Sequence, residues 1–459
     1  MDLLYEVVCT INTYLSNYVL LILLIGTGLF FSIRTRFVQV RCFGEGWKRL
    51  FGNFSLKGGA HGGGMSSFQA LATAIAAQVG TGNIVGACGA LLVGGPGALF
   101  WMWIIAFLGM ATNYAEAVLA IKTRIVDGDG AVHGGPVYYI KTAFKGKFGS
   151  FLAGFFAVAI ILSLGFMGCM VQSNSIAGTM NTAFGIPVWA VGIAVCIVAG
   201  IIFIGGVTRL AATTEKLVPI MAVIYIVGGL IVIIANASHL PETFALIFGC
   251  AFNPSAEVGG VTFGLIAAIT QGAKRGLFSN EAGMGSTPHA HALADVKNPH
   301  EQGVVAMIAV FIDTIIVVTI TGLVVISTMY TGDGAIAQGL WDGLDKTNLA
   351  QVAFGTLFGG NIGAIFVAVC LLFFAFSTIL SWNLFAKINV EYLFGKKAIL
   401  PFTIIALIFI FLGSILSNDL VWELQDMFNQ LMVLPNAIAL IALSGIVTAI
   451  AKTKGKSEE

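Results

Sequence analysis

Charged side chains are scarce in this sequence of 459 residues, since only 10% are Asp, Glu, Lys or Arg while 58% are hydrophobic. Soluble domains carry about 25% charged and about 45–50% apolar residues. So few charges cannot cover the surface of a water-soluble protein of this length. The composition therefore excludes a soluble globular protein and predicts a chain whose main solvent is the lipid bilayer.

Cysteine and the common catalytic motifs are also lacking. The seven cysteines lie mostly in apolar runs without a CxxC pattern, which is typical of small buried hydrophobic residues. No nucleophile elbow, phosphate loop or HExxH motif occurs. His289, His291, Asp295 and His300 resemble a metal cluster only in composition, because they lack helical ligand spacing. We therefore expect no enzyme, no organic cofactor and no metal at these histidines.

Long apolar runs are what the sequence has in abundance. A membrane-spanning helix needs about 20 mainly apolar residues. The sequence predicts eleven such spans, at about residues 14–33, 68–93, 98–121, 150–179, 187–205, 217–236, 258–285, 303–329, 361–386, 399–417 and 427–450. Residues 328–348 form a polar loop, and residues 348–358 a short helix along the membrane surface.

The positions of the basic residues predict the orientation in the membrane, because Lys and Arg accumulate in cytoplasmic loops. With the N-terminus outside, all but one of the 23 Lys and Arg residues fall on the inner side, and Lys346 lies outside. This assignment places Lys274 and Arg275 in the inner half of the seventh span, where we expect them to brace an inner gate against Glu281. The prediction is a multi-pass protein of the cell (inner) membrane with a cytoplasmic C-terminus.

Two of the predicted spans are interrupted by glycine and polar residues near their middle. The second span contains Gly80-Thr81-Gly82-Asn83, and we expect the seventh to break around Thr270-Gln271-Gly272. Glycine disfavours a helix by about 1 kcal/mol relative to alanine. An unwound backbone is tolerated in a membrane only where it lines a cavity or is buried in protein. The alternative is close packing of glycine-rich helices without any ligand.

The two interruptions are five spans apart, which predicts an internal repeat. Five spans form an odd-numbered unit, so the second copy enters the membrane from the opposite side. Paired interruptions in two inverted halves indicate the substrate site of a secondary transporter. We expect residues 1–66 to form an extra helix and a cytoplasmic loop, 67–240 the first repeat, 241–450 the second and 451–459 a cytoplasmic tail.

Two tracts resemble a known family. GGPGALFWMWIIAFLG (Gly94 to Gly109) is similar to the signature of the sodium:alanine symporters, and GAKRGLFSNEAGMGS (Gly272 to Ser286) resembles the same family. The resemblance implies an all-α membrane protein with a leucine-transporter-type fold that imports alanine or glycine with sodium. We expect a monomer whose only partners are sodium, the amino acid and the bilayer.

A more distant resemblance suggests the substrate site. AQVGTGNIVG is similar to the broken first core helix of the leucine-transporter-type neurotransmitter:sodium symporters. The likeness implies that the backbone N–H groups of Thr81 and Gly82 hold the substrate carboxylate, with Gln78 in the pocket. Asn83 matches a residue that offers a side-chain oxygen to a second sodium, so a second ion stays open. The outer-gate arginine of those relatives is replaced by Gly86, so their gate does not transfer.

The same resemblance predicts a sodium site between the second and ninth spans. The segment FFAFSTILSW is similar to the part of those relatives that completes their sodium site. Five oxygen ligands without net charge suit a hard monovalent cation. The implied ligands are the carbonyls of Ala76, Val79 and Phe374 and the hydroxyls of Ser377 and Thr378.

Bulky side chains are expected to limit the size of the substrate. Phe166 or Met167 and Trp382 are the candidates, with packing or lipid contact as the alternative. Gln271 and Gly272 of the second interruption, together with Thr378, are expected to contact the substrate.

Two acidic residues lie inside predicted spans. A carboxylate in the membrane costs at least about 2.5 kcal/mol, so Asp313 is a candidate for a cation site or a coupling proton, or a carboxylate bonded to a neighbouring helix. For Glu116 we favour structural pairing. The function predicted is sodium-coupled import of a small neutral amino acid by alternating access. The alternatives are a proton-coupled carrier that uses Asp313, a channel or a membrane receptor.

Overall fold

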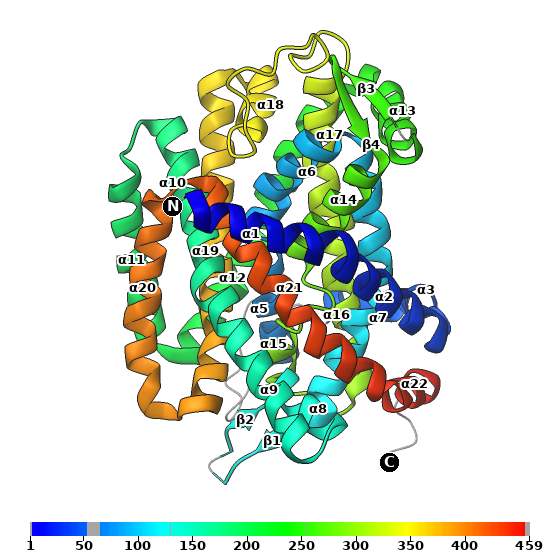
Figure 1. The fold of residues 1–459 in the computed structure, drawn as a ribbon, viewed down its shortest axis with the longest axis vertical. Helices are drawn as coiled ribbons and strands as arrows, with labels where there is room; N and C mark the ends of the chain where they lie inside the picture. The colour runs from blue at the N-terminus through cyan, green and yellow to red at the C-terminus, as the bar shows by residue number, and fades with distance from the viewer. Residues whose placement is uncertain (1, 53–64, 129, 254, 455–459) are drawn as a thin grey trace.

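The computed structural model describes residues 2–52, 65–128, 130–253 and 255–454, and these are mostly helical (Figure 1). Residues 53–64 of the predicted loop and 455–459 of the predicted tail lie outside the described residues. The chain begins with one long helix, made of α1 (Asp2–Tyr14), the π-helical turn η1 (Leu15–Leu20) and α2 (Leu21–Arg34). Two short helices follow, α3 (Val38–Arg41) and α4 (Phe43–Gly52).

The second predicted span is a broken helix, as the glycines indicated. A capping box between Ser66 and Gln69 starts α5 (Ser67–Gln78). Residues 79–80 are irregular, Thr81 already has helical dihedral angles, and the chain resumes as η2 (Gly82–Gly86) and α6 (Ala87–Gly94) at an angle of 44°. The prediction of an interruption at Gly80 is confirmed.

The rest of the first half contains long helices joined by short connections. Gly95 has φ +69°, which ends α6 before α7 (Gly97–Thr123). A small antiparallel hairpin follows, β1 (Ile125–Val126) with β2 (Val132–His133). The remaining helices are α8 (Pro136–Ala143), α9 (Gly146–Ile160), η3 (Ile161–Gly168), α10 (Cys169–Phe184), α11 (Val188–Ile204) and α12 (Gly206–Ala235).

The second half begins with elements that the hydropathy pattern does not predict. A 3-10 turn η4 (Ala237–His239) and α13 (Leu240–Phe252) lead into an antiparallel hairpin, β3 (Ser255–Val258) with β4 (Val261–Gly264). The hairpin lies at the same end of the molecule as α6, α13 and α18 (Figure 1). The helices after it are α14 (Leu265–Asn280), α15 (Pro288–Ala292), α16 (Pro299–Val310), η5 (Phe311–Val318), α17 (Thr319–Val325), η6 (Ile326–Tyr330), α18 (Leu349–Phe358), α19 (Gly360–Phe394), η7 (Lys396–Ala398), α20 (Ile399–Ile415), α21 (Asn418–Ala442) and α22 (Ser444–Thr453).

The predicted break at Thr270-Gln271-Gly272 is wrong. Helix α14 runs through these residues and ends where Glu281 adopts a left-handed conformation with φ 57°. The irregular segment is 281–287, and α15 begins after it at Pro288. Gly272 lies within the helix, and the glycine is explained by packing: a Cβ there would lie 2.5 Å from the Trp101 Cβ. The interruption is therefore about ten residues further along the chain than predicted.

Among the described residues, seven helices are long and apolar enough to cross a membrane, or nine if each of two bent pairs counts as one span. The second bent pair is α21 with α22, which meet at 61°, so the predicted span 427–450 crosses a bend. Helix α11 is also apolar but has only 17 residues, so it is shorter than these nine. The predicted short helix at 348–358 is confirmed as α18. The structure thus bears out a polytopic helical protein but leaves the count of eleven as a prediction.

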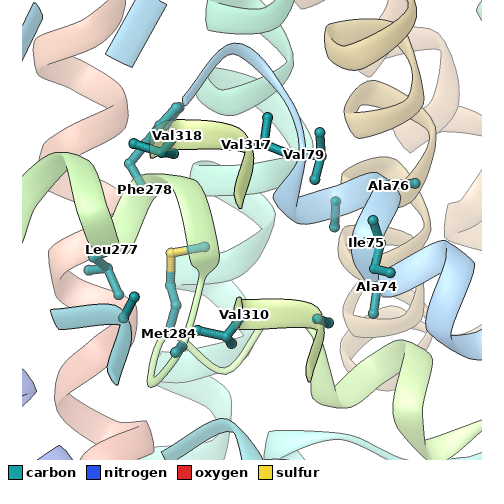
Figure 2. Packing of buried hydrophobic residues seen from close by; sticks show 14 of the residues in the cluster. Ala74, Ile75, Ala76, Val79, Leu277, Phe278, Met284, Val310, Val317 and Val318 are labelled. Atoms are coloured by element: carbon teal, nitrogen blue, oxygen red, sulfur yellow. The ribbon is translucent and has the colours of Figure 1, made fainter. Parts of the chain in front are cut away.

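The hydrophobic core joins both broken helices to the helix formed by α16 and η5. Figure 2 shows Ala74, Ile75, Ala76 and Val79 from the first broken helix, and Leu277, Phe278 and Met284 from the second, in one cluster with Val310, Val317 and Val318. All ten residues are buried. Each break is therefore enclosed in protein, which satisfies the condition for unwound backbone in a membrane.

Candidate functional site

Amide side chains hold the first break open. The Gly80 N–H donates to Asn83 Oδ1 at 2.8 Å, and the Thr81 N–H donates to Gln172 Oε1 at 3.0 Å. Gln172 lies in α10, so a second helix fixes the unwound turn. Sequence reasoning missed Gln172, whose signal is the polar tetrad Gln172-Ser173-Asn174-Ser175 inside an otherwise apolar span. Two backbone N–H groups freed by the break thus have neutral partners that another acceptor can replace.

On the other side of this break, oxygen atoms of α5 face hydroxyls of α19. The Thr378 Oγ1 lies 2.8 Å from the Ala76 carbonyl oxygen, 3.1 Å from that of Phe374 and 3.5 Å from that of Val79. The Ser377 Oγ lies 2.9 Å from the Phe374 oxygen and 3.4 Å from the Ala76 oxygen. The structure therefore brings together all five residues that the sequence predicts as sodium ligands. Both hydroxyls are fully buried.

Gly80 allows this close approach of α5 and α19. A Cβ built on Gly80 would overlap the Thr378 hydroxyl and would lie 3.2 Å from Gln172 Oε1. Any side chain at position 80 must push one of the two helices away. Contact with the Thr378 hydroxyl, a predicted sodium ligand, and with Gln172 therefore favours glycine here, in addition to its effect on the helix.

Several polar atoms at the first break have no hydrogen-bond partner among the described residues. They are Gln78 Oε1, Thr81 Oγ1 and Gln172 Nε2. Gln78 uses its Nε2 to donate to the Asn280 carbonyl at 2.7 Å, which links the first break to the end of α14. A buried polar atom without a partner costs about 1–3 kcal/mol, so such atoms are typical of a site that a polar ligand completes.

Asp313 connects the two broken helices. Its carboxylate accepts from Asn83 Nδ2 at 2.6 Å, from Ser279 Oγ at 2.8 Å and from Thr314 Oγ1 at 2.8 Å. Asn83 belongs to the first broken helix and Ser279 to α14, while Asp313 itself lies in η5. The side chain is fully buried, and three donors satisfy it. This arrangement fits a carboxylate that only bonds neighbouring helices, and it also fits one that serves a cation site or carries a coupling proton.

The second break has a carboxylate at its first residue. The Trp382 indole N–H donates to Glu281 Oε1 at 2.5 Å, and the Ser286 hydroxyl donates to the other oxygen. The Trp382 ring also meets Phe278 edge-on, with ring centroids 5.8 Å apart. Trp382 therefore lies between α19 and the end of α14, close to both breaks, where the size-limiting role was predicted.

Glu116 of α7 holds the unwound backbone of the second break. It accepts hydrogen bonds from the Gly283 N–H at 3.0 Å and the Gly285 N–H at 2.9 Å. Asn436 of α21 donates to the same carboxylate at 2.7 Å and to the Gly283 carbonyl at 2.9 Å. Its partners are thus backbone groups and an amide, in agreement with a structural role.

Three residues predicted to contact the substrate lie apart from this cluster. Phe166 stacks on Phe409 of α20 with ring centroids 4.7 Å apart. Gly272 packs against α7, and Gln271 faces Gly94 at the end of α6, where a glycine Cβ would lie 3.0 Å from the Gln271 Cβ. The prediction for Gln271 and Gly272 depended on a break that α14 does not have.

Lys274 and Arg275 do not pair with Glu281 as predicted. Lys274 Nζ lies 2.7 Å from Asp426 Oδ2, and Arg275 lies 3.1 Å from Asp426 Oδ1. Both precede the break, on the half-helix that follows the β3–β4 hairpin. The Arg275 guanidinium and the Lys346 ammonium lie over the same ring, that of Trp422, at 4.6 and 5.3 Å. Lys274 and Arg275 are therefore on the side of Lys346, which the sequence analysis placed outside.

In the described part of the chain, the histidines that the sequence analysis named have separate partners. His289 lies 2.8 Å from Asn389 Nδ2 and 2.8 Å from the Ser286 carbonyl oxygen, and His291 lies 2.8 Å from Gln302 Nε2. His300 instead contacts the Tyr114 hydroxyl at 2.7 Å.

The fold and the two enclosed breaks define a multi-pass membrane transporter rather than an enzyme. A solved structure of MhsT in complex with L-phenylalanine aligns with a TM-score of 0.58, over 86% of this chain and 100% of that chain, at 14% identity. At that identity the similarity shows the fold alone, which is of the leucine-transporter type.

The sequence gives the family. A model of the sodium:alanine symporter family matches residues 1–458, so the chain belongs to this family of amino-acid symporters. The sodium/alanine symporter AgcS of Methanococcus maripaludis is 40% identical over 99% of this chain and 97% of its own length. YrbD of Bacillus subtilis, provisionally named a sodium/proton-dependent alanine carrier, is 40% identical over 96% of this chain and 90% of its own length.

Proposed function

We propose that the chain is a sodium-coupled symporter of small neutral amino acids that works by alternating access. The oxygen cluster between α5 and α19 carries this proposal, because three carbonyls and two hydroxyls converge there inside the protein. Hard cations prefer such oxygen ligands. With sodium bound, the ion takes the lone pairs of Thr378 and Ser377, and their hydrogens turn to other acceptors.

The substrate carboxylate binds at the first break. It replaces Gln172 Oε1 as the acceptor for the Thr81 N–H and also accepts from the Gly82 N–H, as anions do at helix N-termini. The released Gln172 can then present its Nε2, which has no partner among the described residues, to the same carboxylate. Gln78 and Thr81 supply further polar atoms. Phe166, Gln271 and Gly272 are left out of this site because their contacts face other helices.

We infer that sodium and amino-acid binding are coupled because residues 76–82 contribute to both proposed sites. The Ala76 and Val79 carbonyls bind the ion, and the N–H groups two to six residues later bind the amino acid. Sodium therefore orders the turn that receives the substrate, and each ligand raises the affinity for the other. An inward sodium gradient, with about 2.3 kcal/mol per charge from a potential of 100 mV, then drives accumulation.

Selection for a small side chain follows from Trp382. Its ring is fixed by Glu281 on one side and approaches Gly168 of η3, where a Cβ would lie 2.5 Å from the ring. Alanine or glycine fits beside such a wall, and branched side chains do not. The name of AgcS supports alanine as the substrate.

The proposed topology has eleven spans. The seven long helices and the two bent pairs give nine, and α11 together with α14 and its break completes eleven. We propose inverted repeats at 67–240 and 241–450, with the N-terminus outside, the C-terminus in the cytoplasm and a monomeric assembly. Lys274 and Arg275 then join Lys346 on the outer side, and the other basic residues stay inside.

Uptake of radiolabelled alanine into proteoliposomes tests the function. An inward sodium gradient is compared with a choline control, and unlabelled glycine and leucine are added as competitors. Sodium-dependent accumulation that glycine reduces and leucine does not is the expected result. Accumulation driven by a proton gradient without sodium would contradict the coupling ion and the role of Ser377 and Thr378.

A proton-coupled carrier that uses Asp313 is the second candidate. The observation in its favour is a buried carboxylate bonded to both broken helices. The name of YrbD includes both sodium and protons. Uptake by Asp313→Asn decides the case: loss of proton-driven uptake supports this candidate, and unchanged sodium and pH dependence eliminates it.

A further inference from the structure

A second cluster of ligand-type side chains lies outside the two breaks, between the start of α4 and the start of α16. The Cys42 thiol, one Glu45 carboxylate oxygen and one His300 ring nitrogen all lie within 4.8 Å of one another. Cys42 immediately precedes α4, Glu45 lies in the first turn of α4 and His300 in the first turn of α16. Cys42 and His300 are both 1% exposed.

His300 points an unused nitrogen into this cluster. Its Nε2 has no hydrogen-bond partner among the described residues and lies 3.5 Å from Glu45 Oε1. The other ring nitrogen, Nδ1, lies 2.7 Å from the Tyr114 hydroxyl. A partner on the second nitrogen orients the ring, as the outer hydrogen bond of a metal-binding histidine does. When Nδ1 donates to Tyr114, the Nε2 lone pair is free for a metal ion.

The Glu45 carboxylate also contacts basic residues. Lys454 binds the other carboxylate oxygen, Oε2, at 2.9 Å. Arg49 approaches Oε1 at 3.4 Å but also pairs with Glu301 at 3.2 Å. Arg49 can therefore keep Glu301 when an ion takes Oε1. Lys454 offsets the negative charge that a thiolate and a carboxylate bring to the site.

The two elements that carry the cluster are fixed by packing that does not depend on an ion. A Cβ on Gly46 would overlap the Val304 carbonyl oxygen, so α4 lies directly against α16. The Phe43 ring meets Phe311 edge-on with centroids 4.9 Å apart. The ligands are thus presented by two helices that are already docked, which lowers the cost of forming a metal site.

We propose that Cys42, Glu45 and His300 form a zinc-binding site that fastens α4 to the start of α16, with water as the fourth ligand. Cys, His and Glu are the usual ligands of Zn²⁺, and a thiolate disfavours Mg²⁺ and Ca²⁺. Ligand lengths of about 2.0–2.3 Å at tetrahedral zinc place the ligand atoms about 3.3–3.6 Å apart. The His300–Glu45 distance of 3.5 Å already matches this spacing. All three ligand atoms lie within 4.8 Å of one another.

Metal titration of the purified full chain tests the site, after removal of any polyhistidine tag and treatment with a chelator. Cobalt chloride serves as the spectroscopic probe and zinc chloride as the probe for stoichiometry. We expect one zinc per chain, a thiolate-to-cobalt charge-transfer band and a higher unfolding temperature with zinc. The Cys42→Ser variant should lose the band and bind zinc at least tenfold more weakly, and Glu45→Gln should also bind it more weakly.

Cys250→Ser is the matched control, because Cys250 is a buried cysteine of α13 outside the cluster. It should keep both the band and the zinc affinity. Sodium-driven uptake by each variant shows that the variant is folded, independently of the metal. Zinc binding that is equal in the wild type and Cys42→Ser, or no zinc retained by the wild type, would overturn the proposal.

Discussion

The two breaks of this transporter are stabilised in different ways. The first, at residues 79–80, is held by the neutral amides of Asn83 and Gln172 and leaves polar atoms without partners among the described residues. The second, at residues 281–287, has its backbone N–H groups bound by the carboxylate of Glu116. The carboxylate satisfies two N–H groups of the second break at once, whereas the first break keeps unsatisfied polar atoms among the described residues. We therefore expect ligand binding mainly at the first break and a structural function at the second.

Removal of Glu116 should have the largest effect. Glu116→Ala leaves the N–H groups of Gly283 and Gly285 and the amide of Asn436 without their acceptor, which costs about 1–3 kcal/mol for each buried donor. We expect a strongly lowered unfolding temperature in detergent and loss of alanine uptake. Glu257→Gln on the β3–β4 hairpin is the control and should behave as the wild type. A stable Glu116→Ala protein with weakened sodium binding would reverse the assignment of the two breaks.

A change at the first break should affect binding more than folding. Thr378→Ala removes one of the five proposed sodium ligands, and we expect the sodium concentration for half-maximal uptake to rise about tenfold or more, which is about 1.4 kcal/mol. The unfolding temperature without sodium should change little. Thr403→Ala, which removes a hydroxyl bonded within α20, is the matched control. Unchanged sodium dependence in Thr378→Ala would show that the ion binds elsewhere.

The contact between the breaks should have an intermediate effect. Trp382→Phe keeps an aromatic ring but removes the N–H that donates to Glu281. A lost hydrogen bond costs about 0.5–1.5 kcal/mol, and we expect the alanine KM to rise about fivefold. Trp422→Phe is the control, because the Trp422 N–H has no hydrogen-bond partner among the described residues. Equal effects of the two substitutions would mean that the N–H of Trp382 is unimportant.

The smallest effect on transport is expected at Gly272, where the sequence misplaced the second break. A methyl group there meets Trp101 and the Ala98 carbonyl, at 2.5 and 2.8 Å, so Gly272→Ala should destabilise the protein by about 1–3 kcal/mol. The half-saturation values for sodium and alanine measured by uptake should stay within about twofold. A large change in the alanine concentration for half-maximal uptake would show that Gly272 contributes to the substrate site after all.

Sequence reasoning located the first break because Gly80 and Gly82 flank a polar residue inside an apolar run. It misplaced the second because Gly272 gives the same local signal, although that glycine only accommodates Trp101. The true break begins at Glu281, and a glutamate in a left-handed conformation has no clear signature in a single sequence. The five proposed sodium ligands came from a resemblance and lie together, whereas the pairing of Lys274 and Arg275 with Asp426 joins helices 150 residues apart and depends on tertiary packing.

The overlap between a side chain at position 80 and the Thr378 hydroxyl limits how this chain can change by mutation. A larger residue at position 80 fits only after the hydroxyl at position 378 has been removed. That removal alone takes away a proposed ligand of the ion. Position 80 can therefore be enlarged only together with a change at position 378, and either single change gives a protein with impaired coupling. A descendant that abandons sodium can cross this barrier, because it no longer needs either residue.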